Sequence, residues 1–420
     1  MNLLRYCFLS LLGLCFSTSL QAQLTTEQVS YTYQIAYCVG SQNSTAWIGD
    51  KVVIMIEGET PADRDSTLMT QIVNTFGDII EKFEEVTGLD NLPLYASHAG
   101  KAVIEVVDDN CGAGGLASHG GLGMSTGKVF LDRFYDRLLS HQEIAVPQVF
   151  LYELNRNFWL AGNQGYNSKF DWAMNDEVNN YGWWTVGMNN AMAYMIPDML
   201  GIKLQYFGTY GLDFWKDGML NDFYPYLNDT TYNFDYGWRQ SLMPWRPVQS
   251  INNLMSGLII YSYENFGGEN WLRGFYEQMN GSLIEARSGV FAYQECRDNV
   301  YKVWSLAADQ DLVAFFETDL RWIISQEAKD FVQANVNTTS IPNFDPQASL
   351  KLYPNPVKDV LRLESDDDKL QEVFVFNPLG QVIDTFEFRK SFEWEVSGLQ
   401  AGLYLLRTAA GSFSVKVEKK

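Results

Sequence analysis

Histidine is scarce in this sequence, and its scarcity bears first on metal chemistry. Only three histidines occur in 420 residues, namely His98, His119 and His141. Zinc sites use His, Cys or carboxylate ligands at short recurrent spacings on rigid elements. No two of these histidines stand at such a spacing, so they predict no zinc site by themselves. For each of them we expect an ordinary exposed or packed side chain.

Cysteine is nearly as rare, with five residues in the chain, two of them in the N-terminal leader described below. The remaining three are Cys38, Cys111 and Cys296. An odd number in an exported protein allows one disulfide with one free thiol, or no disulfide at all. We expect Cys38 to pair with Cys111. The alternative is a nucleophilic dyad of Cys111 with His119, for which no activating cation or helix N-terminus is evident.

Basic residues are outnumbered by acidic ones, 30 to 51, which gives a formal net charge of −21. Such a chain repels phosphate backbones, so we expect no nucleic-acid partner. The glycine-rich stretch 109–124 is no phosphate loop, because Gly127-Lys128 is followed by Val129 rather than by Ser or Thr. Two interpretations of the stretch remain. It is a flexible loop that runs into an edge strand, or an edge that lines a cleft with Cys111 and His119.

Long hydrophobic runs are absent beyond the N-terminus. Residues 1–22 are typical of a secretory signal peptide, with Arg5 in the positive region, an apolar stretch at 6–16 and Ala22 before the expected cut. The apolar stretch is too short to span a bilayer, and no later run is long enough. We therefore expect export to the periplasm and then to the cell surface or medium, without a transmembrane segment.

A well-marked helix is expected at 147–159. Its apolar residues recur at spacings of two to four, and Pro147 suits the first turn of a helix. Tyr152 and Arg156 stand one turn apart and share a face, with Glu153 beside them. This is the layout of the HExxH zinc helix with both histidines replaced, and an arginine cannot donate a lone pair to zinc. Glu153 and Arg156, at i and i+3, can form an ion pair.

The rest of the body is predicted to be of the α+β class, with strands in its N-terminal part and helices in its C-terminal part. Expected elements are strands at 30–37, 51–56 and 101–107, a helix at 65–87, a strand end or short helix at 129–139, helices at 184–200, 254–263, 271–279 and 300–316, and long packed loops at 203–250. A linker composition at 336–345 separates this body, 23–335, from a small β domain at 346–420.

The β domain resembles the C-terminal sorting domain of type IX secretion cargo. The matching motifs are Leu352-Tyr-Pro-Asn-Pro-Val357, the turn at 376–381, Ser397-Gly-Leu-Gln-Ala-Gly-Leu-Tyr-Leu405 and the ending at 415–420. The resemblance implies an Ig-like β-sandwich, a Gram-negative source and the type IX secretion machinery as a partner of residues 346–420. Family members often lose this domain after export.

Residues 60–325 resemble gluzincin metallopeptidases of the enhancin and mucin-cleaving type. The resemblance lies in the order of elements around Phe83-Glu-Glu-Val-Thr-Gly88, the Glu153 helix, Asp176-Glu-Val-Asn-Asn180 and the stretch 305–316. It implies a zincin-like fold, with Glu153 at the general-base position and Glu177 at the third-ligand position. The two histidine ligands have no match, so we expect no cofactor, zinc included.

Several functions fit these residues. We favour a polar network of Tyr152, Glu153, Arg156 and Glu177 that fills the former metal site, in a protein that binds a peptide, glycoprotein or glycan without catalysis. The alternatives are a hydrolase with a non-standard metal site and Glu153 as base, and a purely structural surface component. Six tryptophans are either sugar-stacking platforms or core residues: Trp183, Trp184, Trp215, Trp238, Trp245 and Trp271.

Overall fold

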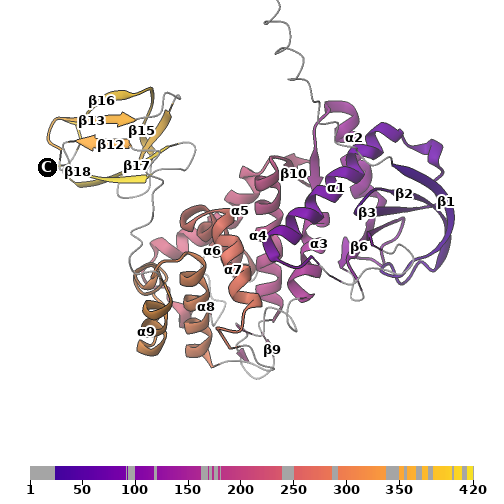
Figure 1. Cartoon of the computed structure of the whole chain (residues 1–420), viewed down its shortest axis with the longest axis horizontal. Coiled ribbons are helices and arrows are strands. Elements are labelled where there is room, and N and C mark those ends of the chain that lie inside the picture. Colours follow the sequence, from indigo (N-terminus) through magenta and orange to yellow (C-terminus); the bar gives the residue numbers. More distant parts are fainter. Residues whose placement is uncertain are drawn as a thin grey trace, which may run out of the picture. The chain divides into compact units, whose positions relative to one another are not determined.

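The computed structural model consists of two compact units, Met1–Asn337 and Thr338–Lys420 (Figure 1). The structure describes residues 24–90, 92, 100–117, 121–161, 169, 173–174, 178–179, 181–238, 250–285, 292–336, 350–353, 357–365, 371–376, 382–399, 402–408 and 414–419. The expected signal peptide lies outside these residues, as do His98, His119 and Glu177.

The first half of unit 1 is built on a six-stranded sheet in the order β1-β2-β3-β4-β6-β5. Its strands are β1 (Thr25–Thr32), β2 (Ser41–Ile48), β3 (Val52–Glu57), β4 (Ala102–Val107), β5 (Gly115–Ala117) and β6 (Gly123–Gly127). The central pairs β3/β4 and β4/β6 are parallel, whereas β5 runs antiparallel to β6. The short strand β5 is therefore at one end of the sheet.

The helix α1 (Ser66–Thr87) confirms the clearest prediction of the amphipathic pattern. The side chain of Asp65 accepts hydrogen bonds from the first free N–H groups, those of Thr67 and Leu68. Gly88 ends the helix in the left-handed conformation, at φ 67°. The helices α2 (Lys128–His141) and α3 (Gln148–Ala161) complete this half, so the stretch at 129–139 is a full helix rather than a strand end.

Three predictions about local structure are wrong in part. The expected helix at 300–316 ends at Ala307, the last residue of α8 (Tyr293–Ala307). The expected strand at 30–37 ends at Thr32, because the next residues turn their N–H groups toward a buried glutamate, Glu105. The region 203–250 is not all loop. It contains the hairpin β10 (Lys203–Tyr206) and β11 (Thr209–Tyr210), then α5 (Asp213–Asn228). Densely placed aromatics and Pro225 obscure the helical period there.

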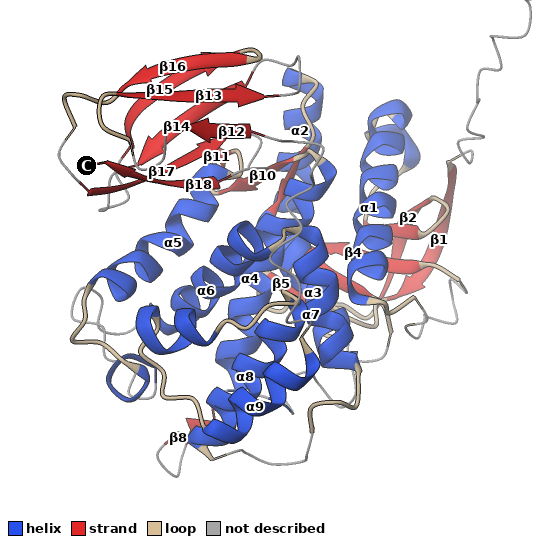
Figure 2. Cartoon of the chain, turned by 60° about the vertical axis from the view of Figure 1, so that its left-hand side comes forward, coloured by secondary structure: helices blue, strands red, loops and turns tan. Residues whose placement is uncertain are grey.

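The second half of unit 1 is mostly helical, as expected (Figure 2). Its helices are α4 (Tyr181–Leu200), α5, α6 (Ser250–Phe266), α7 (Glu269–Asn280), α8 (Tyr293–Ala307) and α9 (Gln326–Asn335). Two short strand pairs accompany them: β7 (Ala145–Pro147) pairs with β10, and β8 (Ala173–Met174) pairs with β9 (Val178–Asn179). Indole and phenyl rings fill the space between these helices, for example Trp304, which is tilted against Trp184 and edge-on to Trp271. The α+β class predicted for this unit is confirmed.

The second unit is a small β-sandwich of two antiparallel sheets. One sheet has the order β12-β13-β16 and the other β15-β14-β17-β18. The strands are β12 (Leu350–Tyr353), β13 (Val360–Ser365), β14 (Gln371–Phe376), β15 (Val382–Phe388), β16 (Ser391–Glu395), β17 (Gly402–Thr408) and β18 (Ser414–Lys419). Alternate residues of both sheets, such as Leu361, Val373 and Leu406, are buried in its own core.

Candidate functional site

The helix α3 presents Tyr152, Glu153 and Arg156 together. It forms because Leu151, Leu154 and Phe158 are fully buried in the main core. It starts one residue later than predicted, since Pro147 is still the last residue of β7. The predicted ion pair is present, with Arg156 Nη1 at 3.0 Å from Glu153 Oε2.

Glu153 also touches the edge strand β5. Its residue is only 5% exposed, and the backbone N–H of Ala117 donates a hydrogen bond to its carboxylate. Burial raises the pKa of this carboxyl, while the charge of Arg156 and the two hydrogen bonds act in the opposite direction. The carboxylate thus joins the helix to the sheet edge.

A glycine in β5 permits this close contact. A Cβ placed on Gly115 would lie 2.6 Å from Val149 Cγ2 and 2.7 Å from Glu153 Cγ, which is too short for any real side chain. On the next strand, Asn157 Nδ2 donates to Gly123 O at 3.0 Å, and Gly123 N–H donates back to Asn157 Oδ1 at 3.3 Å. These contacts hold β5 and β6 against α3, and sequence reasoning missed them.

The Tyr152 side chain lies beside Asn189 of α4. Burial raises the pKa of its phenol, and the Asn189 side chain, which lies beside it, opposes the rise. Asn155, from the same helix, donates from Nδ2 to Asn189 Oδ1 at 2.6 Å. The predicted contact of Tyr152 with Glu177 lies outside the described residues.

The residues of α3 do not fit a zinc ion of the HExxH type. At the two histidine positions stand a tyrosine with a raised pKa, hence a protonated phenol, and an arginine that has no lone pair to donate. Arg156 instead neutralises Glu153. Within the described part of the chain, no three His, Cys, Asp or Glu residues are grouped as metal ligands. His141 is exposed and pairs with Ser140.

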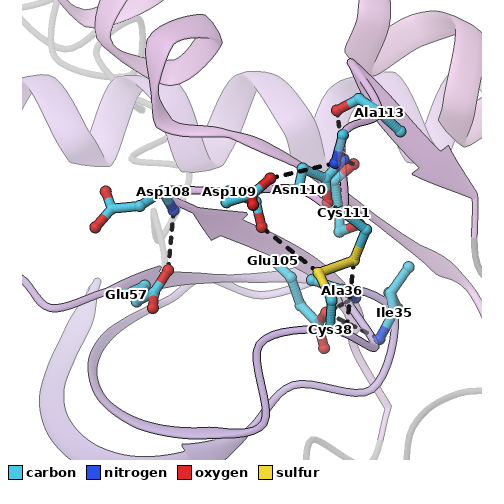
Figure 3. The surroundings of a disulfide bond; sticks show 12 residues. Ile35, Ala36, Cys38, Glu57, Glu105, Asp108, Asp109, Asn110, Cys111 and Ala113 are labelled. Carbon is cyan, nitrogen blue, oxygen red and sulfur yellow. Dashed lines mark hydrogen bonds between the residues drawn. A yellow bond between two sulfur atoms is a disulfide. The ribbon is translucent and has the colours of Figure 1, made fainter.

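Cys38 and Cys111 form the expected disulfide, with Cα atoms 5.7 Å apart (Figure 3). The Cys38 N–H also donates to Cys111 Sγ at 3.3 Å. The alternative of a Cys111–His119 dyad is wrong, because Cys111 has no thiol to ionise. Cys296 is free and buried. The bond ties the loop that leads into β5 to the segment that follows β1.

Of the six tryptophans considered as sugar platforms, the four with described side chains are buried. Trp184, Trp238 and Trp271 are at most 1% exposed and Trp215 is 7% exposed. Trp183 and Trp245 lie outside the described side chains. The four buried indoles are core residues, and the glycan interpretation is wrong for them.

A pocket of about 200 Å³ lies beside the first turn of α3. Its lining includes Gly114 next to β5, residues 147–149, two residues of α2 and the end of β10. Residues from four separate segments form this pocket, so the sequence alone gave no signal for it.

No helix within the described residues combines the length and apolarity that a membrane crossing needs.

Comparison with known proteins gives one family match. Residues 351–420 match the secretion system C-terminal sorting domain. No curated protein matches the chain. Such a domain implies interaction with the type IX secretion machinery, and with it export to a surface or extracellular location, as the sequence predicted.

Three of the solved structures similar to this chain are metallopeptidases. The catalytic module of the metalloprotease ZmpA from Clostridium perfringens is 10% identical, at a TM-score of 0.43, over 88% of this chain and 67% of that one. The ZmpB metallopeptidase of the same organism is 12% identical, at 0.44, over 91% and 70%. A metallopeptidase from Bacteroides thetaiotaomicron is 11% identical, at 0.42, over 90% and 66%. In this chain an α+β body is followed by residues 351–420, which match the secretion system C-terminal sorting domain.

Proposed function

We propose that this chain is an exported protein whose metallopeptidase-like body binds a peptide, glycoprotein or glycan without catalysis. We place the signal peptide at 1–22, the body at 23–335, a linker at 336–345 and the sorting domain at 346–420. After export the protein is at the cell surface or in the medium.

One observation carries this proposal, the ion pair between Arg156 and Glu153. A general base has to be free to take a proton from water, within hydrogen-bond reach of it. Glu153 is instead buried, neutralised by Arg156 and hydrogen-bonded to the backbone of Ala117. The same arginine stands at the position of a zinc ligand in the HExxH helix. This one residue therefore replaces a metal ligand and also pairs with the carboxylate that would act as the base.

Binding is favoured over a purely structural role by what lies next to this network. The outer strand β5 is at the end of the sheet, and the 200 Å³ pocket begins at Gly114, one residue before it. A sheet edge next to a pocket is a common way to hold an extended peptide.

The alternative is a hydrolase with a non-standard metal site and Glu153 as base. Mass spectrometry of a diverse peptide and glycopeptide mixture, incubated with the full chain and with Glu153→Gln, decides between the two. We expect no products above background from either protein. Cleavage by the unmodified chain that Glu153→Gln abolishes, with the fold intact by circular dichroism, would establish the hydrolase instead.

A further inference from the structure

The pocket beside α3 contains a buried polar group without a full set of partners. Gln205, on β10, lines the pocket and is only 3% exposed. Its Nε2 donates to Tyr210 OH at 3.3 Å, but its Oε1 has no hydrogen-bond partner among the described residues. Buried amide oxygens in native proteins nearly always have a partner. A ligand that brings an O–H or N–H group into the pocket would supply it.

A strained aromatic residue stands at the mouth of the same pocket. Phe207 lines it and follows β10 directly, at the tip of the β10–β11 hairpin, with φ at 44° and Gly208 at 87°. Both turn residues are thus left-handed, a conformation that favours Asn-Gly and disfavours a bulky side chain. The Phe207 side chain is nevertheless 73% exposed, with its ring edge-on to Tyr206 at 4.5 Å. Strain held at an exposed aromatic points to a contact with a ligand.

Size and charge narrow the class of ligand further. A volume of about 200 Å³ is below the 300 to 1,000 Å³ range of drug-sized sites, so it suits a single ring. The ring of Phe130 and the guanidinium of Arg133 complete this wall, 5.7 Å apart. Among the described residues Arg133 makes no ion pair, and its guanidinium is held beside the Phe130 ring. An acidic group next to the ring would complement it.

We propose that this pocket binds a tyrosine side chain from an acidic, extended segment of a partner protein whose backbone lies along β5. The phenol ring would pack edge-to-face on Phe207, Tyr206 and Phe130. Its hydroxyl both donates and accepts, so it would pair with the amide of Gln205. Gly114 joins the pocket to the strand. This inference rests on the proposed peptide-binding function and specifies its partner.

Isothermal titration calorimetry of the full chain tests the proposal. The probes are capped pentapeptides with a central tyrosine between glutamates, the same peptide with phenylalanine, and the tyrosine peptide with lysine flanks. We expect the tyrosine peptide to bind at least about tenfold more tightly than the phenylalanine peptide, because the latter leaves the Gln205 amide unpaired. Lysine flanks should weaken binding roughly several-fold, because the peptide then lacks the glutamates that complement the charge of Arg133.

Two variants and one control sharpen the result. Gln205→Leu should bring the tyrosine-to-phenylalanine ratio to about one, whereas Gln148→Leu, the same change at another lining residue, should preserve it. Phe207→Gly should raise the melting temperature, since glycine removes the strain at positive φ, and should weaken the tyrosine peptide about fivefold or more. Opposite effects on stability and binding are not expected of a merely structural residue.

Several outcomes would overturn the inference. These are equal affinity for the two aromatic peptides, a ratio that Gln205→Leu leaves unchanged, no binding of any peptide, or binding of methyl glycosides that Gln205→Leu abolishes. Mass spectra of the titrated peptides distinguish a failure of this inference from a failure of the proposed non-catalytic function. Cleaved peptide would refute the non-catalytic function, while the affinity ratio still decides whether the pocket selects tyrosine.

Discussion

Two buried glutamates, on opposite faces of the same sheet, are held in different ways. Glu105, in β4, is fully buried and accepts hydrogen bonds from the N–H groups of residues 34–36 at 2.7 to 2.9 Å and from Tyr31 OH at 3.0 Å. Glu153 accepts one backbone N–H, from Ala117, and pairs with Arg156. Burial raises the pKa of both carboxyls; the hydrogen bonds oppose the rise at both, and at Glu153 the charge of Arg156 does so as well.

The two carboxylates therefore differ in how much of the fold depends on them. The acceptor capacity of Glu105 is used by backbone N–H groups that have no other acceptor within the described residues, so it fixes the loop after β1. Glu153 depends on one side chain, Arg156, whose own side chain is 29% exposed. Replacing that arginine would change the chemistry of Glu153 with little change to the fold.

The largest effect is expected from removal of Glu105. Glu105→Ala leaves three backbone N–H groups without an acceptor, and should lower the free energy of unfolding by about 4 kcal/mol in urea denaturation. Glu153→Ala, the matched change on the other face, should cost about 1 to 2 kcal/mol. Equal losses at the two positions would remove the distinction between them.

The disulfide links the two sides of this comparison, because Cys38 follows the loop that binds Glu105 and Cys111 precedes β5. The double variant Cys38→Ala with Cys111→Ala should lose about 3 kcal/mol of stability, since the bond closes the loop between two cysteines that are 73 residues apart in sequence. The unmodified chain in reductant should show the same loss. A reduced protein as stable as the oxidised one would contradict the assignment.

A smaller effect on stability is expected from adding a side chain at Gly115, where β5 lies against Glu153. Gly115→Val should cost about 2 kcal/mol, because its side chain would overlap Val149 and Glu153. Gly114→Ala is the control, since its Cβ would meet nothing nearer than Phe130 at 4.0 Å. Thermal unfolding of both variants measures the difference. A well-tolerated Gly115→Val would mean that β5 does not lie against α3.

The smallest effect concerns pH. Without Arg156 the pKa of Glu153 should rise further above its value in the unfolded chain. A raised folded-state pKa stabilises the protein at low pH, and this contribution is lost as pH rises through the folded pKa. Arg156→Leu should therefore cost about 1 kcal/mol at neutral pH and almost nothing near pH 4. Urea unfolding across this range measures the effect, with Arg133→Leu as a control that should show no such trend.

Local signals in the sequence predicted much of the fold. Asp65 and Gly88 marked the ends of α1, and the spacing of Tyr152, Glu153 and Arg156 predicted one helical face with an ion pair on it. Cys38 and Cys111 were the expected pair. These features depend on neighbours along the chain or on a choice among few residues, so a single sequence contains them.

What the sequence could not predict depends on contacts between distant segments. Nothing near Ala117 indicates that its N–H meets Glu153, and Gly115 resembles the other glycines around it until α3 packs against it. Gln205 and Phe207 lie in a stretch that we expected to be loop, and only the pairing of β10 with β7 brings them beside α3.

The zinc content of the purified full chain, after incubation with zinc and exhaustive dialysis, tests the central claim most directly. The double variant Tyr152→His with Arg156→His serves as the positive control, since it restores two imidazoles at i and i+4. We predict that the unmodified chain retains no zinc and that the double variant retains more of it. Zinc close to one equivalent per unmodified chain would contradict the account, because Glu153 would then belong to a working metal site.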